Sequence, residues 1–158
     1  MFKEIFKKII ITIITFEAKL VLKKYKPKIV AITGSVGKTS TKEAAVSVLG
    51  GEFYARGNKG SYNSEIGVPL TILGVKNAYF SVFAWFKNIF TGLSLILKTK
   101  NYPRILVLEF GADKPGDIEN LTGWIKPDVS VITALGDMPV HVEFFSGPES
   151  LRAEKEKK

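Results

Sequence analysis

The chain has 158 residues, of which 46% are hydrophobic and 24% charged, which is typical of one globular domain with a substantial core. It contains no cysteine and a single histidine, His141, which excludes disulfides, thiolate metal sites and metal sites with several histidine ligands. No G-x-S-x-G motif is present, so acyl-enzyme hydrolase chemistry has no support. These features are compatible with a cytoplasmic location.

The net charge of +8 is concentrated at the N-terminus, where residues 1–28 hold eight lysines and two glutamates, a formal charge of +6. Apolar residues at helical spacing predict an amphipathic basic helix over residues 1–27, although the β-branched run 9–16 leaves a strand as the alternative. The apolar run is too short to span a membrane. We expect the helix to pack against the domain, and peripheral contact with a membrane interface is the second interpretation.

Residues 28–49 contain the strongest functional signal. Apolar residues 29–33 predict a buried strand, a glycine-containing loop follows, and helical character begins at Thr41. Such a unit wraps backbone N–H groups around a phosphate, with Lys38 as the positive charge and the Thr39 hydroxyl as a Mg²⁺ ligand. Ile32 stands where the general P-loop has its first glycine, and a turn that merely caps the helix is the alternative. The candidate nucleotide-binding residues are Gly34, Ser35, Val36, Gly37, Lys38, Thr39 and Ser40.

Later segments alternate between strand and helix character. Strands are predicted over residues 52–56, 104–110 and 128–133, and helices over a short segment with Pro69 in its first turn, over 78–97 and over 115–124. This alternation predicts an α/β fold over residues 28–158, with a P-loop-containing, mostly parallel sheet and helices on both faces. The broadly apolar segment 78–97 is expected to be a core helix. The alternatives are a core helix that also faces a membrane or partner, and a helix that spans a membrane.

Two further polar residues fall at the carboxyl ends of predicted strands, where binding sites of parallel sheets form. Glu109 ends an apolar strand, and a buried carboxylate is costly unless it is paired with a cation or bound to a metal. We interpret it as a ligand of Mg²⁺ or of its water, with an ordinary salt bridge as the alternative. His141 lies in the loop after another strand, and an ordinary loop histidine is its alternative.

Four ordered blocks of the sequence resemble the central, ATP-binding domain of the Mur ligases, most closely the MurF type that adds D-alanyl-D-alanine to a peptidoglycan precursor. The blocks are residues 31–45 (AITGSVGKTSTKEAA), 62–73 (YNSEIGVPLTIL), 106–122 (LVLEFGADKPGDIENLT) and 126–136 (KPDVSVITALG). A weaker fifth block begins at His141 (HVEFF) and continues into a lysine-rich segment. The ordered combination is far more specific than the P-loop alone.

The resemblance implies ATP-dependent amide ligation, in which a substrate carboxylate attacks the γ-phosphate and an amine then displaces phosphate from the acyl phosphate. It implies that Lys38 and the loop hold ATP, and that Thr39 and Glu109 serve one Mg²⁺. His141 would serve a second metal ion together with a carbamylated lysine, for which Lys155 matches best and Lys157 is the alternative. From its chemistry alone, Lys155 would be an ordinary solvated lysine. Asn63 would face the substrate, a small-molecule peptidoglycan precursor.

The sequence also departs from this family. Two of the three asparagines in its G-N-x-N-N motif are serines here, Ser61 and Ser64, and the turn at 134–136 lacks its asparagine. The family's nucleotide-sugar domain and C-terminal domain find no counterpart, so we expect an incomplete central domain that needs a missing domain or a partner and does not turn over alone. The alternatives are a ligase like folylpolyglutamate synthase and a non-catalytic, membrane-peripheral nucleotide-binding subunit. No nucleic-acid partner is expected, because basic charge occurs without an aromatic–basic pattern.

Overall fold

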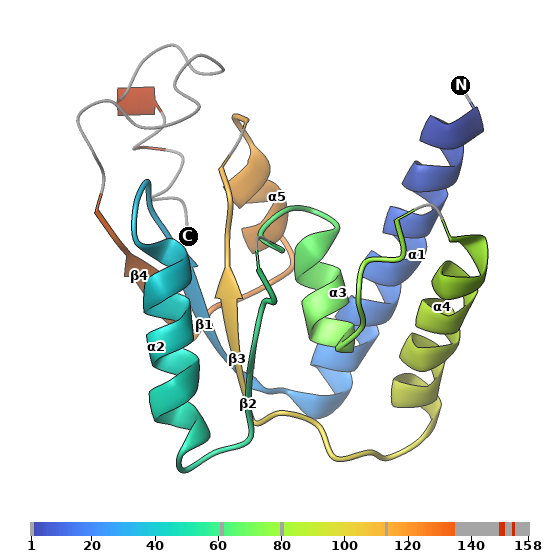
Figure 1. Ribbon diagram of the computed structural model, residues 1–158, viewed down its shortest axis with the longest axis horizontal. Coiled ribbons are helices and arrows are strands. Elements are labelled where there is room, and N and C mark those ends of the chain that lie inside the picture. The colour runs from blue at the N-terminus through green and yellow to red at the C-terminus, as the bar shows by residue number, and fades with distance from the viewer. Residues whose placement is uncertain are drawn as a thin grey trace.

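The computed structural model describes residues 2–60, 62–79, 81–112, 114–134, 149–150 and 153, and the structural statements below refer to these residues. This part of the chain forms five helices and four strands, which alternate except that α4 follows α3 directly (Figure 1). In chain order they are α1 (Phe2–Tyr25), β1 (Lys28–Thr33), α2 (Lys38–Gly50), β2 (Ala55–Gly57), α3 (Gly67–Leu73), α4 (Val82–Leu97), β3 (Ile105–Glu109), α5 (Asp117–Thr122) and β4 (Val129–Ile132).

The four strands form one sheet in the order β2-β3-β1-β4, and every pair is parallel. This confirms the predicted α/β fold and places the ends of β1 and β3 side by side, with Ile32 paired to Glu109. Several predicted boundaries differ from the structure, among them those of α2 and β2. The helix after the loop begins at Lys38 rather than Thr41, and β2 begins at Ala55 rather than residue 52, because the N–H of Phe53 still donates to the Leu49 carbonyl at the end of α2.

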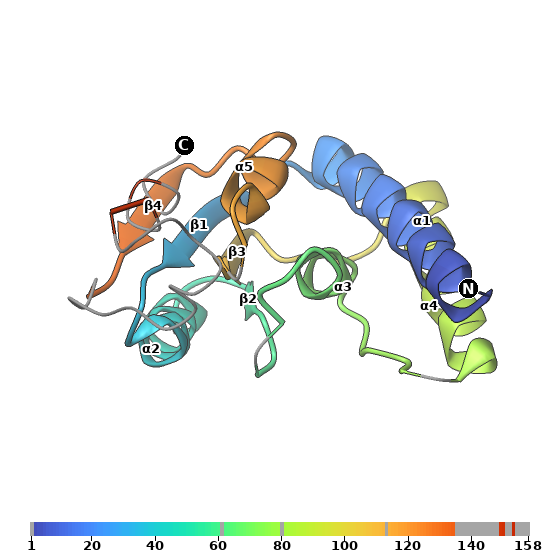
Figure 2. The same cartoon turned by 90° about the horizontal axis from the view of Figure 1, so that it is seen from above.

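Alternation along the strands divides the core between the two faces of the sheet. On one face, Val107 and Ile32 are fully buried beneath α2. On the other, Leu106 and Leu108 belong to the main hydrophobic core with residues of α1, α3 and α5. Seen from above, α2 and α5 lie on opposite sides of the sheet (Figure 2). Glu109 follows Val107 by two residues in β3, so its side chain lies on the same face of the sheet, toward α2.

Helix α1 packs on α3 and α4 through Ile14, Ala18 and Val21, all of which are completely buried. The expected packing of this helix against the domain is therefore confirmed, and the alternative of a strand is wrong. The division into a segment 1–27 and a domain 28–158 stays a prediction. Among the described segments, no helix is both long and apolar enough to cross a membrane.

The start of β4 is tied to β1 by Asp128. Its carboxylate accepts hydrogen bonds from the Lys28 ammonium at 2.6 Å and from the Ile29 N–H at 2.8 Å. These bonds, that from Lys28 foremost, hold the pKa of Asp128 below its usual value. The carboxylate thereby fixes the first residues of the two neighbouring strands in register.

Helix α4 differs from its prediction. It begins at Val82, with the Ser81 hydroxyl as N-cap acceptor for the Ala84 N–H, so residues 78–81 precede it. Only one of its faces is buried, the one that carries Trp85, Gly92 and Leu95. The expectation of a helix that serves only the core is wrong, because the stripe on its other side, Phe83, Phe86, Phe90, Leu93 and Leu97, remains exposed.

Candidate nucleotide-binding site

The loop between β1 and α2 depends on two glycines. Gly34 has φ +145° and Gly37 has φ +88°, which are conformations that side chains disfavour. A Cβ on Gly34 would also collide with the Oγ1 atom of Thr133, which follows β4. The loop can therefore turn sharply and pass close to the end of β4 only because glycine stands at this position.

Several donors of the loop point toward its interior. Helix α2 has Gly37 as N-cap residue, so no side chain caps the helix, and the N–H groups of its first turn lack intrahelical acceptors. The Lys38 ammonium donates to the carbonyls of Gly34 at 2.8 Å and Ser35 at 3.3 Å, which uses two of its three hydrogens. The backbone N–H groups of Ser35 and Val36 instead donate to the carbonyl of Ala134, at 3.0 and 3.3 Å. The end of β4 thus supports one side of the loop. The N–H groups at the N-terminus of α2 and the Lys38 ammonium are the donors that could bind an anion.

Glu109 is the centre of the polar contacts beside this loop. Its side chain is almost completely buried, with 2% of the residue exposed. The Thr39 hydroxyl donates to its Oε2 atom at 3.1 Å, and the Asn63 side-chain amide donates to its Oε1 atom at 3.3 Å. The carboxylate therefore joins the start of α2, the end of β3 and the loop after β2, as expected for a site at the carboxyl edge of the sheet.

Lys42 supplies the positive charge that this buried carboxylate needs. Its ammonium lies 3.4 Å from Oε2 of Glu109 and also donates to the Gly60 carbonyl at 3.1 Å. Lys42 follows Thr39 by three residues in α2, so both side chains lie on the helix face that points at β3. The salt bridge given as the alternative for Glu109 is present, and its role as a ligand of Mg²⁺ stays a prediction.

Asn58 holds the backbone around Glu109. Its Oδ1 atom accepts from the Glu109 N–H at 2.8 Å, and its Nδ2 atom donates to the carbonyls of Glu109 and Tyr62. A further bond joins the Gly111 N–H to the Asn63 carbonyl at 2.8 Å. These contacts fix the polar loop against the end of β3, so that Asn63 reaches the carboxylate.

The loop, Asn63 and Glu109 line one open pocket of about 410 Å³. Hydroxyl and carboxylate oxygens such as those of Thr39 and Glu109 suit Mg²⁺, which commonly takes one or two protein ligands and fills its other positions with phosphate oxygens and water. Within the described residues, no group of three acidic or histidine side chains could hold a metal ion by itself. The oxygen atoms of Thr39 and Glu109 therefore fit Mg²⁺ that is bound together with a nucleotide.

Comparison with characterised proteins gives the family. The chain is 30% identical over 120 residues to the UDP-N-acetylmuramoyl-tripeptide–D-alanyl-D-alanine ligase of Bacillus subtilis, an alignment covering 76% of this chain and 21% of the ligase. It is 30% identical over 141 residues to the same ligase of Borreliella burgdorferi, covering 89% of this chain and 25% of the ligase. The crystal structure of MurF ligase from Thermotoga maritima in complex with ADP superposes with a TM-score of 0.66 at 29% identity, over 92% of this chain and 28% of that one.

The chain is similar to one part of the MurF-type Mur ligases. No protein-family model matches it. A MurF structure from Acinetobacter baumannii, 24% identical with a TM-score of 0.65, covers 90% of this chain and supports the fold. The chain spans only about a quarter of the length of these relatives, and its parallel sheet corresponds to part of a domain.

In this MurF-like chain, the structure brings most of the predicted site residues together. Ser35, Val36, Gly37, Lys38, Thr39, Ser40, Asn63 and Glu109 line the same pocket, and Gly34 shapes its loop. His141 and Lys155, predicted to serve a second metal ion, lie outside the described residues, so their roles stay predictions. Sequence reasoning missed Lys42 and Asn58. The spacing of three residues from Thr39 could have indicated Lys42, whereas Asn58 had only its place in a polar loop.

Proposed function

We propose that this chain is the nucleotide-binding part of an ATP-dependent ligase that forms an amide bond during peptidoglycan-precursor synthesis. The observation that carries the proposal is the convergence of Thr39, Lys42 and Asn63 on the Glu109 carboxylate, beside a loop that presents Lys38 and a helix N-terminus. The relatives that share these segments are named as ligases of a muramoyl tripeptide and D-alanyl-D-alanine. Nothing in the described site favours the alternative of a ligase like folylpolyglutamate synthase.

The proposed chemistry requires negative charge on a transferring phosphoryl group to be neutralised. Lys38 already lies within the loop, where its remaining N–H can reach a phosphate oxygen, and the N–H groups of the first turn of α2 point the same way. A substrate carboxylate would attack the γ-phosphate of ATP, which releases ADP and forms an acyl phosphate. An amine would then attack the acyl carbon and release phosphate, so that the amide bond is the product.

Mg²⁺ would supply further charge neutralisation when it is bound with ATP. Thr39 and Glu109 are the side chains that would hold it. Lys42 contacts the same Oε2 atom of Glu109 as the Thr39 hydroxyl, so it balances the buried negative charge and holds the carboxylate toward the loop. The lysine is therefore a positioning residue in this proposal.

The acid substrate would approach from a second pocket, of about 670 Å³, between α1 and α5. Asn63 lines both this pocket and the nucleotide pocket, so it stands where a carboxylate would pass toward the phosphate. Lys19 and Lys114 at the larger pocket could pair with anionic groups of the precursor, and Glu65 and Asp117 line the same pocket. The use of ATP places the reaction in the cytoplasm, and turnover is expected to need the parts of the relatives that this chain does not span.

Titration calorimetry of the 158-residue chain with ATP and Mg²⁺ tests the nucleotide site. The wild type should bind, and Lys38→Ala should weaken binding by about tenfold or more, because a charge-assisted contact with a phosphate is lost. Lys100→Ala, at an exposed lysine far from the pocket, is the matched control and should bind like the wild type. Equal affinity of the Lys38 and Lys100 variants would overturn the assignment.

A further inference from the structure

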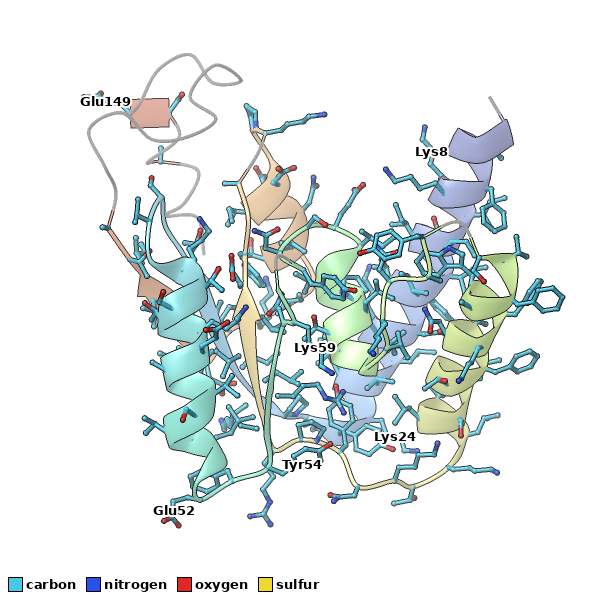
Figure 3. The ribbon with its side chains drawn as sticks, in the orientation of Figure 1. Lys8, Lys24, Glu52, Tyr54, Lys59 and Glu149 are labelled. Carbon is cyan, nitrogen blue, oxygen red and sulfur yellow. The ribbon has the colours of Figure 1, made fainter. Side chains whose placement is uncertain are left out.

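The outer face of α4 is an apolar surface of unusual exposure. Phe83 is 90% exposed, Phe90 67% and Leu97 79%, although such side chains are normally covered. Side chains project from α4 away from the body of the molecule (Figure 3). We define the α4 stripe as Phe83, Phe86, Phe90, Leu93 and Leu97, which follow one another three or four residues apart.

The α4 stripe is part of a preformed surface, because α4 is fixed to α1 at its C-terminal end. The Lys24 ammonium donates to the carbonyls of Leu95, Ile96 and Lys98, at 2.8 to 3.0 Å, and the Tyr25 hydroxyl donates to the Leu95 carbonyl at 3.0 Å. Figure 3 shows Lys24 where the ends of the two helices meet, and Lys8 on the opposite half of α1. The stripe is therefore held outward by hydrogen bonds rather than exposed by fraying.

The segments of the chain that contain α1 and α4 carry its excess positive charge. Between Glu65 and Glu109 the sequence has no acidic residue, but it has five basic ones, Lys76, Lys87, Lys98, Lys100 and Arg104. The neighbouring helix α1 lies in the segment 1–28, with its formal charge of +6. Because the whole chain carries +8, the remaining residues are net acidic, and the excess positive charge belongs to the two segments that contain α1 and α4.

We propose that the α4 stripe, with the lysines of α1 and α4, docks the protein on the surface of an anionic lipid membrane. An apolar helix face flanked by lysines has the chemistry that lies in a membrane interface without crossing the bilayer. A second copy of this chain would bring two strongly basic surfaces together, which opposes dimerisation through the same face. The proposal is independent of the proposed ligase function, since the nucleotide pocket lies at the other side of the molecule, beside α2 (Figure 1).

Co-flotation of the 158-residue chain with vesicles tests this proposal. One set of vesicles contains phosphatidylcholine with about 30 mol% phosphatidylglycerol, and the other contains phosphatidylcholine alone. The wild type should float with the anionic vesicles, much less with the neutral ones, and less as salt is raised. Phe83→Glu with Phe90→Glu should reduce binding about tenfold or more, and Lys23→Glu with Lys87→Glu should abolish the preference for anionic lipid.

Matched controls separate docking from general changes of surface. Val48→Glu on α2 alters a residue that is 76% exposed, and Lys59→Glu alters an exposed lysine of the loop after β2; both should float like the wild type. Far-UV circular dichroism and urea denaturation like those of the wild type show that the double variants are folded. Equal flotation of all variants, or no flotation of the wild type, would overturn the proposal. It would also be overturned if, in place of vesicle binding, the phenylalanine changes abolished a concentration-dependent dimer or an oligonucleotide complex.

Discussion

Lys42 and Glu109 form an ion pair of 3.4 Å in which each residue is only 2% exposed. A buried ion pair stabilises a fold modestly, but removing one partner leaves an uncompensated charge in a dry environment. The other contacts of Glu109 are neutral donors, the Thr39 hydroxyl and the Asn63 amide. Among the described residues, Lys42 is therefore the charged partner of this buried carboxylate.

We predict that Lys42→Met lowers the free energy of unfolding by about 3–5 kcal/mol, measured by urea denaturation. Combining it with Glu109→Leu should recover much of this loss, because no charge is then left buried. Lys59→Met, at an exposed lysine, is the control and should change stability by less than about 0.5 kcal/mol. Strictly additive effects of the two site substitutions would show that the pair is not coupled.

The Thr39 hydroxyl should matter for the metal rather than for the nucleotide alone. Thr39→Val removes one oxygen ligand while keeping the shape of the side chain, so affinity for ATP with Mg²⁺ should fall by about tenfold. In the presence of a chelator, wild type and variant should bind ATP alike. Thr41→Val, two residues farther along α2, is the control; if it weakens Mg²⁺-dependent binding as much, the hydroxyl of Thr39 has no special role.

Two glycines allow a matched test of the loop. Gly34→Ala combines an unfavourable φ of +145° with a collision at Thr133, so it should destabilise the protein by at least about 1–3 kcal/mol and abolish ATP binding. Gly50 is the last residue of α2, and a Cβ added there would meet no other atom. Gly50→Ala should therefore leave ATP binding intact and raise stability by up to about 1 kcal/mol. Thermal unfolding and calorimetry measure both effects. Full ATP binding by the Gly34 variant would contradict the derived role of this loop.

A buried acid outside the site gives a prediction about pH. Glu17 of α1 is 3% exposed beside Gly92 of α4, and among the described residues neither of its oxygens has a hydrogen-bond partner. Burial raises the pKa of Glu17 to about 7 from its ordinary value of 4.5. The folded protein therefore keeps a proton that the unfolded chain releases, and stability should fall as pH rises from about 4.5 to about 7.

Glu17→Gln should remove this pH dependence and stabilise the protein above pH 7 by up to about 3 kcal/mol. The measurement is urea denaturation at a series of pH values. Glu43→Gln, at an exposed glutamate of α2, is the control and should leave the profile unchanged. An unaltered pH profile in the Glu17 variant would mean that this carboxyl titrates as it does in the unfolded chain.

Much of the candidate site could be predicted from local pattern. Three features can each be recognised from a few neighbouring residues: the apolar run before Gly34, the Lys38–Thr39 pair and the acid at the end of β3. This is possible because strand patterns and loop conformation depend on local sequence. The relation of Glu109 to Lys42 was not predictable in this way. The two residues are 67 positions apart, and whether a lysine side chain reaches a given carboxylate depends on the register of β1 with β3 and on the rotation of α2.

The sequence by itself determined the kind of sheet, the phosphate-binding loop and the resemblance to Mur ligases, since periodicity and motif spacing are written along the chain. Only the tertiary structure decided which side of α4 is covered, because both of its stripes are apolar and the choice depends on where α1 packs. It also decided that the buried acid at position 109 has a cation of its own. Burial and charge pairing are properties of segments distant in sequence, and they are fixed only when those segments come together.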